Sequence, residues 1–214
     1  YQNAFASIHP ETGRPSYDPE HKPVTGSETS FCPSLWGGKD WPPAAYNPET
    51  GLLYIPANDN HCGIVEGREV TYMPGSSFTG ARTQMTVPET AEHIGEIQAW
   101  DMNTGEEVWT REFESHNWGG ILTTSGNLVF SGGTSDRFFR AHDASTGEEL
   151  WRFRTNSGII GVPSSFSVDG RQYVAVQSGW GVDAAGMTAR IDQQRGTSTF
   201  VPQGGVIWVF ALPE

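Results

Sequence analysis

Short runs of apolar or alternating residues recur along the chain, and Gly-, Pro- and Asn-containing turns separate them. The runs Ile97–Trp100 and Glu149–Phe153 alternate as half-buried strands do, and Val206–Leu212 is a continuous apolar run. We find no segment with helical periodicity long enough to predict a substantial helix. The pattern therefore predicts an all-β protein built from many short strands.

The clearest pattern is an internal repeat. Seven of the eleven positions in the first copy recur 42 residues later (99 to 141), and the two copies are Ala99–Trp109 and Ala141–Trp151. A period near 42 residues is typical of one four-stranded blade of a β-propeller. The repeat therefore predicts propeller blades.

Each copy of the repeat contains the chemistry of a tight turn followed by a tryptophan. The Asp side chain can accept hydrogen bonds from the backbone two residues later, and the Gly supplies the positive φ that the reversal needs. We interpret Trp109 and Trp151 as packing residues between neighbouring sheets, because a large flat ring buries much area there. The repeated glutamates, which are Glu106, Glu107, Glu148 and Glu149, are interpreted as solvated turn residues.

The organisation that we predict is part of a single β-propeller domain over residues 1–214, a length that accommodates about five repeats. Residues 59–93 lack periodicity and are predicted to form a long loop excursion. The sequence starts without Met or a signal peptide, so we expect a processed or truncated N-terminus.

Composition and motifs narrow the function classes. A net charge of −12 argues against a nucleic-acid partner, and no apolar run reaches the length of a membrane span. Familiar catalytic and nucleotide-binding motifs are absent, and the six histidines lack the spacing of metal ligands. The residue patterns alone thus predict a β-propeller without an assigned activity.

The two cysteines, Cys32 and Cys62, lie 30 residues apart without CxxC spacing, which argues against a zinc site. They could form a disulfide or remain two buried thiols. An even count in an acidic, lysine-poor β protein favours a disulfide and an exported protein.

A family resemblance extends this interpretation. Six motifs, in order along nearly the whole chain, resemble the C-terminal part of the quinoprotein alcohol dehydrogenases, the pyrroloquinoline quinone (PQQ) enzymes of the methanol and ethanol dehydrogenase type. The motifs are Cys32–Trp41, Ala45–Pro56, Ala99–Gly105, Trp118–Phe130, Val168–Val176 and Gly179–Gly181.

The resemblance implies a fold and an activity. The fold is the C-terminal arc of an eight-bladed propeller with tryptophan docking motifs, completed by an N-terminal part. The activity is oxidation of a small alcohol to an aldehyde by PQQ with Ca²⁺ or a lanthanide, in the periplasm, with electrons passing to a cytochrome c. A base outside this chain would take the hydroxyl proton while hydride passes to the quinone.

Four cofactor-binding residues follow from the resemblance. Trp41 and Trp118 match tryptophans beside the cofactor, and the indole N–H of Trp118 can donate to a PQQ carboxylate. Val182 matches a position that contacts PQQ through its backbone. Asp40 stands where the family has Asn beside the quinone; an Asn can donate to a quinone carbonyl, whereas an ionised Asp cannot.

The resemblance also implies a Cys32–Cys62 disulfide. The family's catalytic base and metal ligands match no residue here, so we predict no catalytic and no metal-binding residue in this chain. The alternative is a non-catalytic propeller that acts as a scaffold or binding module. The Trp-Gly-Gly motifs at Trp36 and Trp118 favour the enzyme, because a scaffold does not need them.

Overall fold

The computed structural model describes residues 1–76 and 79–212. The chain divides into two compact units, which we describe separately. The first unit comprises Tyr1–Gly38 and Asp59–Ala91, and the second comprises Lys39–Asn58 and Glu92–Glu214.

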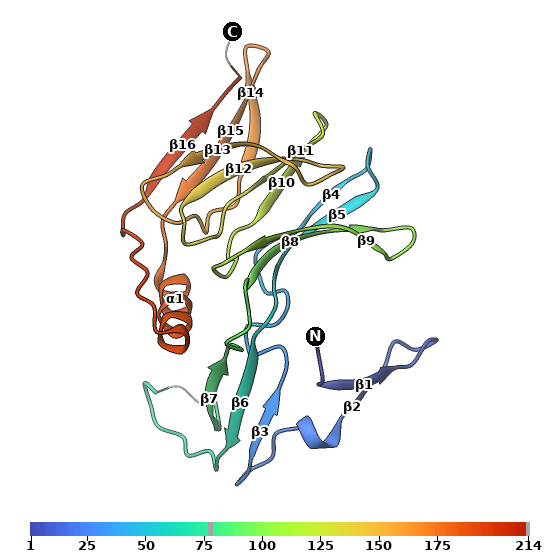
Figure 1. Ribbon diagram of the computed structural model, residues 1–214, viewed down its shortest axis with the longest axis vertical. Helices are drawn as coiled ribbons and strands as arrows, with labels where there is room; N and C mark the ends of the chain where they lie inside the picture. Colours follow the sequence, from blue (N-terminus) through green and yellow to red (C-terminus); the bar gives the residue numbers. More distant parts are fainter. Residues whose placement is uncertain (77–78, 213–214) are drawn as a thin grey trace. The chain divides into compact units, whose positions relative to one another are not determined.

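The first unit contains a hairpin and a three-stranded antiparallel sheet (Figure 1). The hairpin pairs β1 (Phe5–Ile8) with β2 (Pro15–Tyr17), and a 3-10 turn at Pro19–His21 follows. The sheet has the order β3-β6-β7, with strands at Glu28–Phe31, Cys62–Gly67 and Ala81–Thr86.

The prediction of a loop over residues 59–93 is wrong at β6 and β7, which lie within that stretch and pair over six positions. The strands escaped detection because their side chains are mostly polar or partly exposed, so they carry little apolar alternation.

The second unit contains three antiparallel sheets whose strands follow one another in sequence order. The first two sheets have four strands each and the third has three. The first comprises β4 (Ala45–Asn47), β5 (Leu52–Asn58), β8 (Gly95–Asp101) and β9 (Glu107–Phe113). The second comprises β10 (Ile121–Thr124), β11 (Leu128–Ser131), β12 (Phe138–Asp143) and β13 (Glu149–Arg154). The third comprises β14 (Ser164–Val168), β15 (Arg171–Ser178) and β16 (Val206–Phe210).

The two copies of the repeat form equivalent turns, at β8–β9 and at β12–β13. In each copy, Oδ1 of the Asp accepts a hydrogen bond from the backbone N–H two residues later, at 2.7 Å from Asp101 and 2.9 Å from Asp143. The glycines Gly105 and Gly147 have φ of +72° and +69°. Both predictions from turn chemistry are confirmed.

The first copy's tryptophan joins the first sheet to the second. Trp109 is 9% exposed, and its Nε1 donates to the carbonyl of Ala144 in the turn of the second copy, at 3.0 Å. Tyr54 donates to the same carbonyl at 3.0 Å. The interpretation of Trp109 as an inter-sheet packing residue is confirmed. The apolar core around it contains Leu52, Tyr54, Ile97, Ala99, Ile121, Val129 and Ala144.

The second copy's tryptophan packs less completely. Trp151 is 39% exposed, although its ring makes edge contacts with Phe210 of β16 and Phe139 of β12, at centroid distances of 5.1 and 6.2 Å. The second and third sheets share a core that includes Phe139, Ile159, Val174 and Val176. Trp151 therefore packs between sheets as predicted, but it stays at the margin of the core.

A helix that the sequence analysis did not predict follows β15. This helix, α1 (Val182–Arg195), ends at Gly196, whose φ of +66° is the left-handed conformation common at a helix end. Its buried residues, Ala184, Met187, Thr188 and Ile191, follow the spacing of one helical face. Two of the four are small or polar, so the apolar signal was too weak to reveal the helix.

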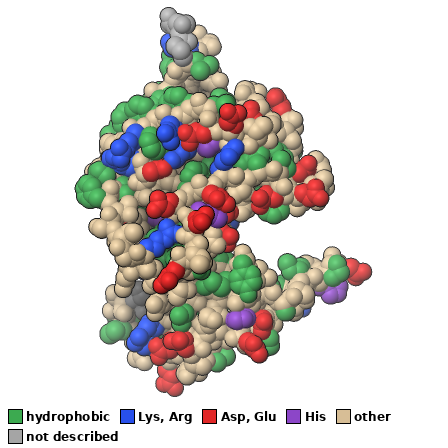
Figure 2. Space-filling view, viewed as in Figure 1, with side chains coloured by type: hydrophobic (Ala, Val, Ile, Leu, Met, Phe, Trp, Pro, Cys, Tyr) green, Lys and Arg blue, Asp and Glu red, His purple; other side chains and the backbone are tan. Residues whose placement is uncertain are grey.

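Among the described residues, every helix is too short or too polar to cross a membrane. On the face drawn in Figure 2, basic side chains stand among acidic ones and do not form a continuous basic area.

Candidate functional site

Two of the predicted site residues lie together in the second unit. The rings of Trp41 and Trp118 meet edge to face, with centroids 6.1 Å apart and planes at 88°. Trp41 lies on the irregular segment before β4, and Trp118 lies between β9 and β10. The structure therefore brings together two tryptophans that are 77 residues apart in sequence (41 to 118).

Close backbone contacts hold this pair. Pro42 and Pro43 lack an N–H, so the segment that carries Trp41 cannot join a sheet as a regular strand. The carbonyl of Pro43 instead accepts a hydrogen bond from the backbone N–H of Ile121, at 3.1 Å. A Cβ at Gly120 would stand 3.0 Å from the Pro43 ring, so the glycine permits this approach.

The two indoles differ in their exposure. Trp41 is 52% exposed, whereas Trp118 is 5% exposed. Within the described residues, Nε1 of Trp118 has no hydrogen-bond partner. A buried donor without an acceptor is costly, and buried N–H groups in native proteins are usually paired. The unpaired indole N–H is therefore the feature of this site that most clearly points to an acceptor from outside the chain.

Asp40 is exposed, and its carboxylate is engaged with its own segment. Oδ1 of Asp40 accepts a hydrogen bond from the backbone N–H of Trp41, at 2.6 Å. An ionised carboxylate is an acceptor only. Asp40 thus fixes the backbone at Trp41.

Val182 is the first residue of α1, and its side chain is almost fully exposed. Gly181 before it makes no side-chain cap, so the backbone N–H groups of the first turn are available to an acceptor. No hydrogen bond or ring contact within the described residues links Val182 to Trp41 or Trp118. The structure thus joins three of the four predicted residues, and the role of Val182 stays a prediction.

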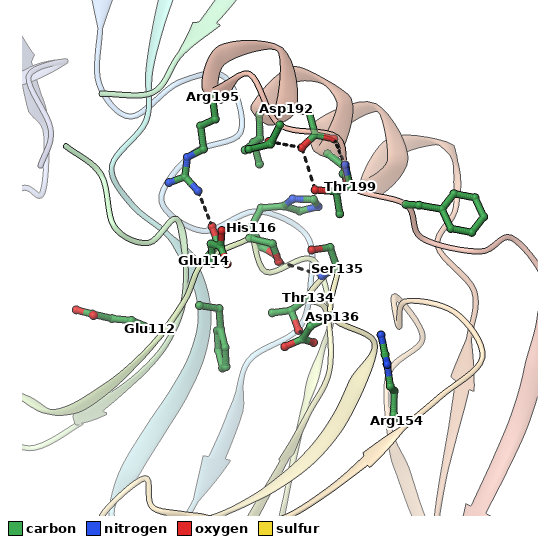
Figure 3. Close-up of a pocket in the computed structure, with 16 residues that line it drawn as sticks. Glu112, Glu114, His116, Thr134, Ser135, Asp136, Arg154, Asp192, Arg195 and Thr199 are labelled. Carbon is green, nitrogen blue, oxygen red and sulfur yellow. Dashed lines mark hydrogen bonds between the residues drawn. The ribbon is translucent and has the colours of Figure 1, made fainter. Parts of the chain in front are cut away.

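A separate cavity of about 530 Å³ lies beside α1 (Figure 3). Its lining combines hydroxyl groups with charged groups, and Asp136, Arg154, Asp192 and Arg195 are among the charged side chains. None of the four predicted cofactor-binding residues lines it. Sequence reasoning missed this cavity because helix α1 was not predicted.

Two carboxylates of the cavity wall, Asp136 and Asp192, are bound to the protein itself. Burial raises the pKa of Asp136, but the charge and hydrogen bond of Arg140 outweigh it and leave that pKa below its ordinary value. Burial likewise raises the pKa of Asp192, and hydrogen bonds from Thr197 and Thr199 bring it below the ordinary value. Both groups therefore stabilise the cavity wall as carboxylates.

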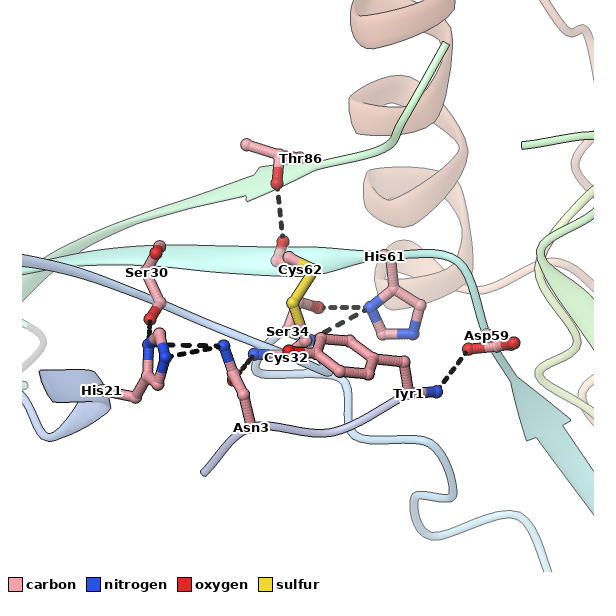
Figure 4. Close-up of a disulfide and its surroundings, with 10 residues drawn as sticks. All are labelled: Tyr1, Asn3, His21, Ser30, Cys32, Ser34, Asp59, His61, Cys62 and Thr86. Carbon is pink, nitrogen blue, oxygen red and sulfur yellow. Dashed lines mark hydrogen bonds and ion pairs between the residues drawn. A yellow bond between two sulfur atoms is a disulfide. The ribbon is translucent and has the colours of Figure 1, made fainter. Parts of the chain in front are cut away.

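The first unit contains the predicted disulfide, so the prediction of a Cys32–Cys62 pair is confirmed (Figure 4). A small polar network surrounds it: the backbone N–H of Cys32 donates to Asn3 at 2.7 Å, and Ser34 Oγ lies 2.8 Å from His61 Nδ1. The bridge joins the segment after β3 to the start of β6.

Comparison with known proteins assigns the family. A family model described as "Glucose/ethanol/alcohol dehydrogenase, beta-propeller domain" matches residues 110–174. The chain is 39% identical to the quinoprotein alcohol dehydrogenase PedH of Pseudomonas putida, over 94% of this chain, and 38% identical to a lanthanide-dependent methanol dehydrogenase of Methylorubrum extorquens, also over 94%. The chain belongs to the quinoprotein alcohol dehydrogenase family.

A solved structure agrees with this assignment. A europium-containing methanol dehydrogenase matches 99% of this chain with a TM-score of 0.85 and 35% identity. The prediction of an all-β propeller fold is therefore confirmed, while the number of eight blades stays a prediction.

The quinoprotein relatives are much longer than this chain. The matches cover 34% of PedH, 36% of the lanthanide-dependent enzyme and 40% of the europium-containing structure. The chain thus spans about a third of the length of the curated relatives it matches.

Proposed function

We propose that this chain is the C-terminal arc of a larger propeller that oxidises alcohols with PQQ. The observation that carries the proposal is the buried, unpaired Nε1 of Trp118 beside the half-exposed ring of Trp41. An indole N–H at the wall of a site suits an acceptor-rich, planar polycarboxylate such as PQQ. The residues present therefore fit this cofactor.

In this proposal, each residue has a limited role. Trp118 donates its N–H to a cofactor carboxylate, Trp41 contacts the cofactor with the exposed part of its ring, and Val182 offers a backbone N–H from the start of α1. Asp40 is predicted to lie beside the cofactor, and its carboxylate accepts a hydrogen bond from the backbone N–H of Trp41. PQQ, when bound, would act as the two-electron oxidant of the alcohol. The catalytic base and the ligands of a Ca²⁺ or lanthanide ion would come from outside this chain.

The names of the relatives support the rest of the proposal. They include alcohol dehydrogenases and lanthanide-dependent methanol dehydrogenases. We accordingly propose small alcohols as substrates. From the family resemblance we further propose a cytochrome c as electron acceptor and a periplasmic location, to which the disulfide is suited.

The strand count supports an incomplete ring. Within the described residues the third sheet has three strands, whereas the two before it have four. Trp109 packs on the turn between the third and fourth strands of the next sheet. The equivalent turn for Trp151 would follow β16, and it would lead to a fourth strand. Trp151 is 39% exposed against 9% for Trp109, and within the described residues no turn of a following sheet covers it.

The test is a titration of the full-length protein with PQQ in the presence of Ca²⁺ or La³⁺, followed by absorbance. We expect a quinone band that saturates and an alcohol-dependent reduction of an artificial acceptor. Substitution of Trp118 by Phe removes the N–H and keeps a ring, so it should raise the PQQ concentration for half-saturation by about tenfold.

The matched control is Trp208→Phe, because Nε1 of Trp208 already donates to Ser178 at 3.0 Å within the protein. It should leave the half-saturating concentration unchanged. Failure of the wild-type protein to take up PQQ would refute the enzyme and favour a non-catalytic propeller.

A further inference from the structure

In the segment that carries Trp41, the backbone carbonyls of Asp40 and Pro42 lie outside the strands of the sheets. Pro42 and Pro43 have no N–H, and the N–H of Trp41 is used by Asp40. Within the described residues no backbone N–H donates to the carbonyls of Asp40 and Pro42, so these carbonyls depend on water or on a side chain. Unpaired carbonyls let an irregular segment adopt several conformations, which would leave the position of the Trp41 ring undefined.

One side chain satisfies both carbonyls. Nζ of Lys39 donates to the carbonyl of Asp40 at 2.5 Å and to the carbonyl of Pro42 at 2.9 Å. Hydrogen bonds from an ammonium group are stronger than those between neutral groups. The ammonium therefore links the carbonyls of the two residues that flank Trp41.

The far end of the segment is fixed independently, because the Pro43 carbonyl accepts from Ile121 and the Pro43 ring packs on Gly120. Gly120 lies two residues after Trp118, so this contact ties the segment to the partner tryptophan. The near end lacks such an anchor from the sheet and relies on the Lys39 ammonium and the Asp40 carboxylate.

We propose that Lys39 is a positioning residue that holds Trp41 edge to face against Trp118, and so shapes the wall on which the cofactor packs. The first part of this proposal concerns the protein without cofactor; the second part rests on the function proposed above. Lys39 touches neither indole in this role and acts through the backbone of the segment.

The first experiment uses the wild-type full-length protein and needs no substitution. This chain has two lysines, Lys22 and Lys39, and both are exposed. An ammonium that donates to two carbonyls is less available to an acylating reagent. We expect acetic anhydride to modify Lys39 about tenfold more slowly than Lys22, as measured by peptide mass spectrometry. Equal rates would overturn the proposal.

The second experiment uses Lys39→Met, with Lys22→Met as the matched control. Two indoles in edge contact give an exciton-coupled circular dichroism signal, and Trp41→Phe defines the spectrum without it. We expect Lys39→Met to lose this signal in the cofactor-free protein, Lys22→Met to keep it, and Lys39→Arg to restore most of it because it keeps a cationic donor. Retention of the signal in Lys39→Met would overturn the proposal.

The PQQ titration separates the two parts of the argument. We expect Lys39→Met to raise the PQQ concentration for half-saturation about tenfold, with a melting temperature equal to that of Lys22→Met. If the dichroism signal is lost but the wild-type protein takes up no PQQ, then the positioning role stands and the proposed function fails. If the signal is lost and PQQ binds equally well, the role of Lys39 in the cofactor wall is refuted.

Discussion

The indole of Trp109 lies directly against Gly147, and this contact joins the first repeat to the second. A Cβ on Gly147 would stand 2.6 Å from Cε3 of the indole. The glycine is therefore required twice, once for its positive φ and once for the space that the ring occupies. Neither repeat contains this contact by itself, because the contact forms only between the first repeat and the second.

This contact gives a prediction with an internal control. Gly147→Ala should destabilise the protein by about 2–5 kcal/mol, because it combines backbone strain with overpacking. Gly105→Ala changes the same position of the other repeat, where φ is +72° and a Cβ meets nothing within 4 Å. Its cost should be the backbone strain alone, about 1–2 kcal/mol. Urea denaturation followed by tryptophan fluorescence measures both, and equal costs would contradict the docking role.

The buried His142 predicts a pH dependence of stability. Burial lowers the pKa of His142 from 6.5 to about 4, although Nδ1 donates to the carbonyl of Gly147. The unfolded chain binds a proton at this residue below pH 6.5, while the folded chain does not until about pH 4. Stability should therefore fall as the pH drops through this window, by up to about 3 kcal/mol.

The measurement for His142 is the free energy of unfolding in urea at pH 7.5 and pH 4.5. His142→Gln cannot take up a proton at this position, so its loss of stability between the two pH values should be smaller than that of the wild type by about 2 kcal/mol. The same loss in both proteins would show that other groups cause the acid sensitivity.

The disulfide predicts a redox dependence of the first unit. Cys32 and Cys62 close a loop with a sequence separation of 30, for which chain entropy predicts a stabilisation of about 3–4 kcal/mol. A reducing agent should lower the free energy of unfolding of the wild type, measured in urea, by about this amount. It should not affect the Cys32→Ala/Cys62→Ala double variant, and a wild type that is insensitive to reductant would contradict the prediction.

The edge of β16 predicts the behaviour of the isolated 214-residue chain. Ile207 is 72% exposed and Val209 on the same face is 54% exposed, on a strand that has one neighbour within the described residues. An exposed apolar edge strand invites pairing with another chain. The isolated chain should therefore self-associate, and the Ile207→Lys/Val209→Lys variant should reduce this association.

Light scattering over a range of protein concentrations would measure that association. Met102→Lys is the control, since Met102 is 56% exposed but lies in a turn and presents no strand edge. If the chain is an arc of a larger propeller, as proposed above, a strand from the rest of that propeller would cover β16 in the full-length form. If the control reduces association as much as the double variant does, the added positive charge causes the reduction, and the prediction that the β16 edge drives association is wrong.

The internal repeat was sufficient to predict much of the local structure of this protein from the sequence. Asp101, Gly105 and their counterparts specify local turns, so the sequence predicted these turns and the strands beside them correctly. The docking role of Trp109 also followed, because a ring placed at one position of each repeat must meet the neighbouring repeat. The family resemblance identified the quinoprotein dehydrogenases, to which the chain belongs.

Other features depend on tertiary structure. Helix α1 buries only a narrow stripe, and the packing of that stripe stabilises a segment whose apolar pattern is weak. Strand β6 likewise pairs with β3 on one side and with β7 on the other, and the apolar alternation of β6 and β7 is too weak to give a sequence signal.

The candidate site shows the same division. The family resemblance marked Trp41 and Trp118 as candidates, but only folding decided that they meet, because their contact joins segments far apart in sequence. The two hydrogen bonds of Lys39 are also invisible in the sequence, since an exposed lysine next to an aspartate resembles any solvated charge. Local patterns determined the turns and strands of this protein, whereas non-local packing decided which side chains share a site.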